Sequence, residues 1–334
     1  MSQIKKVLNI AEPPITSYPK YANIMSILRD HPSYKEWLFI NHVQLHSDYA
    51  YNSFWLDFCQ PLTRQYYPLI TRQAISKETI VKNHINISEL IINNISEDNY
   101  VYMSIDTFYI PGYYHFEIEH SNHDMFIYGY DKEKSVFYIS DFFKGSYSHS
   151  TATFIQLENA FYSKSVTSTA NFINVQLLKV NYKSVIPFNK DFFSDSLSDY
   201  LNSHNSTYRY AGIENPLCNN LFCFGINAIL DLKDYIIKNE YTYNALRALH
   251  ILYDHKKLMH LRCMYLLSNN YINDAIIVEN SERIKNNALM VRNLYIKYGV
   301  SGNKLWKEEF IVLLDQLIEE DRRNNESLLA NMKK

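Results

Sequence analysis

The stretch that decides the fold reads His123-Asp-Met-Phe-Ile-Tyr-Gly-Tyr-Asp131 and continues, after a short connection, as Ser135-Val-Phe-Tyr-Ile-Ser-Asp141. Two runs rich in aromatic and β-branched residues flank a polar turn, which predicts a β-hairpin. A histidine opens the first run and an aspartate closes the second, so both lie at the open end of the hairpin. An imidazole oriented by a carboxylate is the base-containing part of a nucleophile–His–Asp site.

Whether these two side chains meet depends on the register of the hairpin. Side chains directly opposite each other on two antiparallel strands share one face of the sheet. A connection with an odd number of residues predicts pairs whose numbers add up to 264, and then His123 faces Asp141. An even connection predicts 265, and the two side chains then lie on opposite faces. In the first case Asp141 fixes the tautomer and His123 acts as a base; a hydrogen bond at a strand end is the structural alternative.

The sequence divides into an α+β part and a helical part. We expect an α+β domain over 1–190 and an all-α helical domain over 191–334. Thr16 or Ser17 is expected to cap the first helix, which has Pro19 in its first turn. Further helices are predicted over 76–96, 153–161, 191–202, 219–238, 243–267, 273–298 and 303–332. Strands are predicted over 100–106, 113–119, 123–131, 135–141 and 171–180.

Composition excludes several classes of function. The formal net charge of −2 gives no global attraction to nucleic acid or to an anionic membrane. Glycine is scarce and no glycine-rich phosphate-binding motif occurs. We find no signal-peptide pattern and no apolar run of about 18 residues, so no membrane partner is expected.

The cysteines have no paired CxxC spacing, so neither a disulfide framework nor a structural zinc site is predicted. The four are Cys59, Cys218, Cys223 and Cys263. A reducing, cytoplasmic compartment follows from this usage. His115, His120 and His123 suggest a metal site only if the strand between them runs straight, and no carboxylate stands at a standard ligand spacing. We therefore expect neither a metal nor a cofactor.

Several segments together resemble the butirosin-biosynthesis acyltransferase family, over roughly residues 12–180. They are Asp106-Thr-Phe-Tyr-Ile-Pro111, His123, Ile127-Tyr-Gly-Tyr-Asp131 and Phe137-Tyr-Ile-Ser-Asp141. That family is similar in fold to the bacteriocin-processing, papain-like cysteine peptidases. The resemblance implies a papain-like core, an N-terminal helix on an antiparallel sheet, with a Cys–His–Asp triad. His123 would be its general base and Asp141 the orienting group.

The resemblance also implies the reaction and the partners. Members of the family transfer an acyl group from the thioester of an acyl or peptidyl carrier protein to an amine in natural-product biosynthesis. Phosphopantetheine would enter only as part of the carrier protein, and the acceptor would be a small amine. The basic stretch Asp254-His-Lys-Lys-Leu-Met-His-Leu-Arg262 is either a solvated helix face or a dock for such an acidic partner.

The nucleophile is the point at which this chain departs from the family. The family's cysteine stands at the start of the first helix, whereas the corresponding segment here, Ile15-Thr-Ser-Tyr-Pro-Lys-Tyr-Ala-Asn23, has none. Ala22 is the position of a lost or substituted nucleophile. Cys59 is the alternative nucleophile, although burial among aromatic residues also explains a cysteine there.

Three functions therefore stay open. The first is an amide-forming acyltransferase, with backbone amides near Tyr21 to Asn23 as oxyanion donors. The second is a catalytically inactive papain-like binding or scaffold protein of a biosynthetic cluster. The third is a cysteine peptidase or hydrolase.

Overall fold

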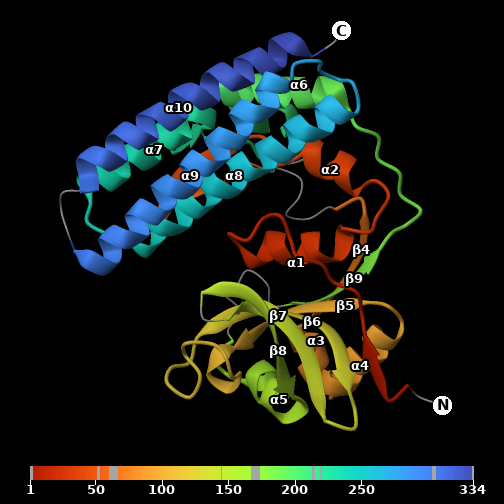
Figure 1. Ribbon diagram of the computed structural model, residues 1–334. Coiled ribbons are helices and arrows are strands. Elements are labelled where there is room, and N and C mark those ends of the chain that lie inside the picture. Colours follow the sequence, from red (N-terminus) through yellow and green to blue (C-terminus); the bar gives the residue numbers. More distant parts are fainter. Residues whose placement is uncertain are drawn as a thin grey trace. The chain divides into compact units, whose positions relative to one another are not determined.

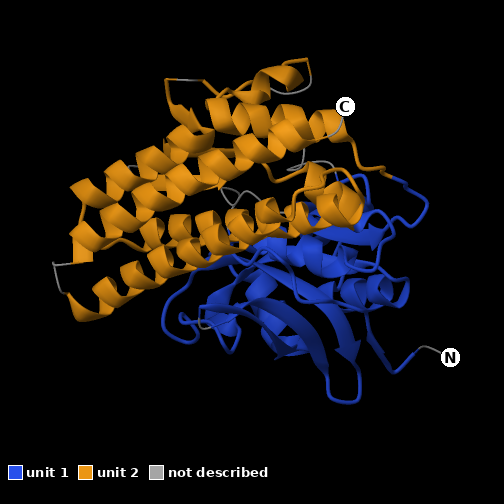
Figure 2. Cartoon of the chain, turned by 45° about the horizontal axis from the view of Figure 1, so that its top comes forward, with its two compact units in different colours: residues 1–34, 67–185 blue, residues 35–66, 186–334 orange. Residues whose placement is uncertain are grey.

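The computed structural model describes residues 3–50, 53–59, 67–143, 145–166, 174–212, 215–218, 220–302 and 306–332. The chain forms two units, each made from two separate stretches of sequence (Figure 2). Unit 1 comprises Met1–Tyr34 and Tyr67–Val185, and unit 2 comprises Lys35–Tyr66 and Ile186–Lys334. The second boundary lies close to the predicted one at 190, but residues 35–66 group with the C-terminal unit.

Unit 1 is built on an antiparallel sheet in the order β4-β9-β5-β6-β7-β8, with β1 paired to β6. Its strands are β1 (Lys5–Val7), β4 (Ile70–Ser76), β5 (Tyr100–Asp106), β6 (Asn122–Asp131), β7 (Val136–Phe143), β8 (Ser146–Thr153) and β9 (Asn174–Val180). Strand β5 is buried at every position. This mixture of helices and antiparallel strands is the predicted α+β class.

Helices of unit 1 begin where the sequence offers a cap. Ser76 caps α3 (Lys77–Lys82), Asn86 caps α4 (Ile87–Ser96), and Thr153 forms a capping box at α5 (Phe154–Tyr162). The single helix predicted over 76–96 is thus two helices. In α1 (Pro19–Leu28) the N-cap residue is Tyr18, which makes no side-chain cap, so the predicted cap at Thr16 or Ser17 is wrong.

Helices cover both faces of the unit 1 sheet. Phe137 packs on Phe154 of α5, with ring centroids 4.5 Å apart. Ser140 lies on the other face, because side chains alternate along a strand. There Tyr147 bridges Ser140 to Asn23 of α1, at 3.2 and 3.0 Å. Figure 1 accordingly shows α1 and α5 on opposite sides of the sheet.

Unit 2 combines long helices with a three-stranded antiparallel sheet in the order β10-β2-β3, so it is not all-α as predicted. The strands are β2 (Leu45–Ala50), β3 (Ser53–Phe58) and β10 (Phe222–Phe224). The helices are α2 (Tyr34–Ile40), α6 (Lys190–Asn202), η2 (Ser206–Tyr210), α7 (Gly225–Lys238), α8 (Tyr243–Ser268), α9 (Ala275–Ser301) and α10 (Trp306–Asn331). No helix in the described part of the chain is both long and apolar enough to cross a bilayer.

Helix α8 explains why residues 35–66 belong to unit 2. Arg262 is fully buried and donates to the carbonyl oxygens of Phe39 and Asn41, at 2.7 and 2.8 Å. His255 is also fully buried, and its Nε2 lies 2.8 Å from the carbonyl oxygen of Val43. These cationic and polar groups satisfy the backbone of the segment that leaves α2. The basic stretch over 254–262 is therefore largely interior, and the expectation of a solvated or docking face there is wrong.

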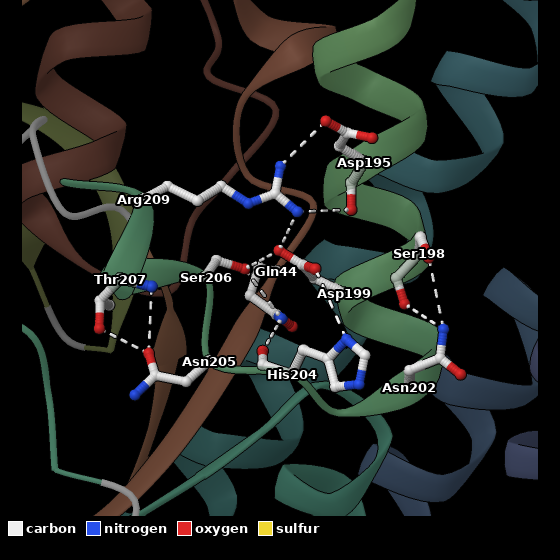
Figure 3. A network of polar contacts seen from close by, with 10 residues as sticks. All are labelled: Gln44, Asp195, Ser198, Asp199, Asn202, His204, Asn205, Ser206, Thr207 and Arg209. Atoms are coloured by element: carbon white, nitrogen blue, oxygen red, sulfur yellow. Dashed lines mark hydrogen bonds and ion pairs between the residues drawn. The ribbon is translucent and has the colours of Figure 1, made fainter.

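A polar network ties the same segment to α6 (Figure 3). Asp199 accepts a hydrogen bond from Ser206 at 2.8 Å and pairs with Arg209 at 2.7 Å. Gln44 donates to Ser206 at 3.2 Å and to the carbonyl oxygen of His204 at 2.9 Å. Gln44 stands directly before β2, so the network anchors the small sheet to the helices of unit 2.

A second buried charge on α8 holds the helices of unit 2 together. Lys256 is 1 % exposed and donates to Asp321 of α10 and to the hydroxyl of Tyr200 of α6, both at 2.7 Å. Tyr200 in turn donates to Asp321 at 2.6 Å. Burial lowers the pKa of Lys256, and the charge of Asp321 opposes that effect. The ion pair is complete only when all three helices are in place.

Removal of Lys256 tests this core. We expect Lys256→Ala to lower the free energy of unfolding by about 3–5 kcal/mol, because Asp321 is left buried without its cation. The adjacent Lys257→Ala, at a partly exposed position, should change it by about 0.5 kcal/mol or less. Urea denaturation followed by circular dichroism measures both. Equal effects of the two variants would contradict a buried ion pair.

Candidate active site

The hairpin of β6 and β7 contains a β-bulge that decides which side chains share a face. The connection 132–135 has four residues, and the pairs next to it, such as Asp131 with Val136, have numbers that add up to 267. Beyond Tyr128 the pairs are Ile127 with Ile139 and Phe126 with Ser140, whose numbers add up to 266. One extra residue in β6 therefore shifts the register by one.

The bulge brings His123 and Asp141 to the same face of the sheet. An even connection alone would put them on opposite faces, as the sequence argument stated, and the extra residue restores the shared face. Neither predicted register is found, because both predictions assumed two regular strands without a bulge. The predicted contact nevertheless forms, with His123 Nδ1 3.0 Å from Asp141 Oδ2.

Asp141 is fully buried and its two oxygens are both used. Oδ2 binds His123 and accepts a short hydrogen bond from the hydroxyl of Tyr113. Oδ1 accepts the backbone N–H of Phe142 at 2.7 Å. Three donors on one buried carboxylate fix its position. The carboxylate can therefore hold the imidazole in one orientation.

His123 presents its second nitrogen at a partly open position. Its Nδ1 points at Asp141 and at the carbonyl oxygen of Asp124, 2.8 Å away, so Nδ1 carries a proton. The side chain is 38 % exposed, which leaves the ring accessible to a ligand. Burial lowers the pKa of His123, but the hydrogen bond and charge of Asp141 outweigh it and raise the pKa to about 9. The imidazole is therefore mostly protonated at neutral pH.

Asp124 adds a second carboxylate beside this pair. It accepts hydrogen bonds from Tyr102 at 2.9 Å and from Ser104 at 3.0 Å, so both partners are neutral hydroxyl groups. Burial raises the pKa of Asp124, and these two hydrogen bonds oppose the rise. Within the described residues, no lysine or arginine contacts Asp124 or Asp141. Of these two carboxylates, the imidazole of His123 contacts only that of Asp141, and the charge of Asp124, on the other face of β6, adds to the rise in the pKa of His123.

The segment expected to carry the nucleophile, residues 15–23, holds no cysteine. Ala22 is fully buried in α1, which packs on β6 and β7 at the face of Ser140. Because side chains alternate along β7, Asp141 points to the opposite face of the sheet. The backbone N–H groups of Tyr21 and Ala22 both donate to the carbonyl oxygen of Tyr18, at 3.1 Å. These amides are therefore engaged within the helix, and the expectation that they serve as free oxyanion donors is wrong.

Cys59 belongs to unit 2, at the end of β3, whereas His123 belongs to unit 1. The side chain of Cys59 is buried, and its backbone N–H donates to the carbonyl oxygen of Gln44 at 2.8 Å. The other three cysteines also fall within the residue ranges of unit 2, so unit 1 has no thiol in its sequence. The role of Cys59 as a nucleophile stays a hypothesis.

The three histidines that suggested a metal site have three different partners. His115 pairs with Glu119 at 3.4 Å and His120 with Asp106 at 2.7 Å, while His123 pairs with Asp141. Across the described residues, no group of three or more histidine, cysteine or acidic side chains is placed to hold a metal ion. The segment 113–119, predicted as a strand, consists of turns, so the straight spacing that a shared site needs is missing.

Sequence reasoning missed Tyr113, which completes the site. It lies in the segment between β5 and β6, and its hydroxyl reaches the carboxylate that orients His123. The only local signal is Pro111-Gly112, which marks a turn directly before it. With 29 tyrosines in the chain, nothing in the sequence distinguishes this one.

Titration of His123 tests the geometry of the site. The pKa of His123 should be about 9, and in Asp141→Asn it should fall, because the hydrogen bond and the charge of Asp141 are lost while burial still lowers it. The folded protein therefore gains stability below pH 6.5 that is lost as the pH rises through 9. Since the ring is 38 % exposed, this gain is only about 1 kcal/mol after solvent screening. NMR titration and urea unfolding at pH 6 and pH 9.5 measure both; a normal pKa in the wild-type protein would contradict the pair.

No protein-family model and no curated protein matches this chain. The geometry of the chain's own residues therefore carries the functional argument.

Proposed function

We propose that unit 1 is a papain-like domain that transfers an acyl group from a carrier-protein thioester to an amine. His123 acts as the general base and Asp141 orients it. The observation that carries the proposal is the contact between a partly exposed imidazole and a buried carboxylate that three donors hold in place. A base held in this way, with one nitrogen accessible, is the arrangement that acyl transfer requires.

The reaction does not need a protein nucleophile. The acceptor nitrogen attacks the thioester carbonyl carbon, a C–N bond forms, and the C–S bond breaks. Neutral His123 takes the proton that the nitrogen loses, and the departing thiolate is protonated in turn. This direct transfer suits a unit whose sequence contains no cysteine. Ala22 then marks a position where a covalent acyl intermediate has become unnecessary.

An amine suits this site better than an alcohol or water. The negative charges of Asp141 and Asp124, which raise the pKa of His123, also favour a cationic ammonium over a neutral ligand. The pKa of His123, about 9, is also close to that of an alkylammonium group and far below that of water, whose pKa is about 15.7. Proton transfer from a bound ammonium group to neutral His123, which frees the amine for attack, is therefore nearly balanced in free energy.

The donor would be delivered by an acyl or peptidyl carrier protein in the cytoplasm. Phosphopantetheine would enter only as the arm of that carrier protein. Antiparallel strands with an N-terminal helix packed on β6 and β7 agree with a papain-like core. A cysteine peptidase is the weaker candidate, because unit 1 supplies no thiol.

A binding or scaffold protein of the same fold is the second candidate, and a specific observation favours it. Ala22 is fully buried where the resembling family has its reactive cysteine, and a methyl group cannot attack a thioester. In that case the protonated His123 and its partner Asp141 would form a recognition site rather than a base.

A model reaction separates these candidates. The wild-type protein should accelerate transfer of the acetyl group of S-acetyl-pantetheine to n-propylamine, with thiol release followed by absorbance and N-propylacetamide by mass spectrometry. His123→Ala should reduce the rate by about 100-fold, which is the smallest rate enhancement that a general base typically contributes. His115→Ala, which removes a histidine outside the pair, is the matched control. The rate should rise up to a pH near 9, as His123 becomes neutral. Equal rates with and without wild-type protein would leave only the binding role.

A cysteine introduced at position 22 tests the papain-like arrangement. In a papain-like arrangement the thiol of Ala22→Cys would have a pKa below the ordinary 8.5, because the imidazolium of His123 would stabilise a thiolate. Since α1 covers the face of Ser140, opposite to that of Asp141, we expect burial to raise the pKa instead. Ala160→Cys, at an equally buried alanine of α5, is the matched control and should have a raised pKa. Thiolate absorbance against pH measures both variants. If the thiol pKa in Ala22→Cys does not respond to the added substitution His123→Ala, the papain-like placement of α1 is contradicted.

A further inference from the structure

The segment between β5 and β6 is folded so that one tyrosine reaches the candidate site. Gly112 has a φ of 102°, which L side chains rarely adopt, and a Cβ there would lie 3.2 Å from the ring of Phe143. The segment is closed by backbone hydrogen bonds from Thr107 to Ser121 at 2.9 Å and from Glu117 to Phe108 at 3.0 Å. Tyr113 follows Gly112, so this turn fixes its direction.

The ring and the hydroxyl of Tyr113 both contact the His–Asp pair. Its ring lies against His123, with centroids 5.4 Å apart, and against Phe143 at 5.0 Å. Its hydroxyl donates to Asp141 Oδ2, the same oxygen that binds His123. Burial and the charge of Asp141 raise the pKa of Tyr113 well above its ordinary value. The phenol therefore stays a neutral donor at every pH at which His123 titrates.

We propose that Tyr113 is a positioning residue that sets the proton affinity of His123 by competing for Asp141 Oδ2. A donor on that oxygen draws charge density away from the bond to the imidazolium. A weaker donor at position 113 makes Asp141 a better partner and raises the proton affinity of His123. A stronger donor has the opposite effect. The inference rests on the proposed function only for its effect on turnover. There Tyr113 would set the pH at which His123 becomes neutral and can act as a base.

The test uses NMR titration of His123 in the full-length protein, without any substrate. Tyr113→Phe keeps the ring and removes the hydroxyl, and should raise the pKa of His123 by about 0.5. Replacement of Tyr113 by 3-fluorotyrosine, a stronger donor of nearly the same shape, should lower it. Tyr114→Phe is the matched control, because Tyr114 is adjacent and 69 % exposed; it should leave the pKa unchanged.

A double variant shows whether the effect passes through Asp141. In an Asp141→Asn background, Tyr113→Phe should no longer change the pKa of His123, whereas a purely local packing effect would persist. Opposite shifts for phenylalanine and fluorotyrosine, both abolished by Asp141→Asn, would support the proposal. No shift, shifts of the same sign, or shifts that persist in Asp141→Asn would overturn it. Since turnover is measured separately with S-acetyl-pantetheine, an inactive protein with these shifts would refute the proposed function and leave the role of Tyr113 standing.

Discussion

The buried carboxylate of Asp141 is the constraint on which unit 1's site depends. A charge removed from water persists only if hydrogen bonds replace its hydration, and here three elements supply them. The backbone of β7 provides the Phe142 N–H, β6 provides His123, and the segment before β6 provides Tyr113. The bulge at Tyr128 is needed for the second of these donors, and the turn at Gly112 for the third. The bulge and the turn, although separated in the sequence, therefore both position donors to one buried carboxyl group.

Elements with strong local signals could be predicted from the sequence. Strand β5 and helix α8 lie within one residue of their expected bounds, because an apolar run and a 3.6-residue period need no distant partner. Strand β8, Ser146–Thr153, was missed, since its polar residues pair only with β7 at the sheet edge. The bulge could not be predicted either: it stands beside Gly129, where β1 approaches so closely that a Cβ would lie 2.9 Å from the Lys6 carbonyl oxygen. That contact joins residues far apart in the sequence.

The prediction of a basic surface on α8 was wrong for the same reason, because the partners of its charged side chains are distant in the sequence. Lys256 and Arg262 indicated a basic surface because lysine and arginine are seldom buried. Their partners are Asp321 on one side and the carbonyl oxygens of Phe39 and Asn41 on the other. More than 200 residues separate Arg262 from the backbone it binds. Only the fold shows that these charges are internal, and that residues 35–66 share their unit.

The missing thiol changes what a strongly basic histidine can do. In a Cys–His pair, a high proton affinity of the imidazole stabilises the thiolate, so the histidine works in its charged form. Without the thiol, the same affinity leaves His123 mostly protonated at neutral pH, and the small neutral fraction must act as the base. Such a base is poorly matched to water or an alcohol but well matched to an ammonium group. The negative charges of Asp141 and Asp124 are the cause of that high proton affinity, and the same charges favour a cationic ligand. The proposed amine acceptor therefore depends on one electrostatic feature of the site.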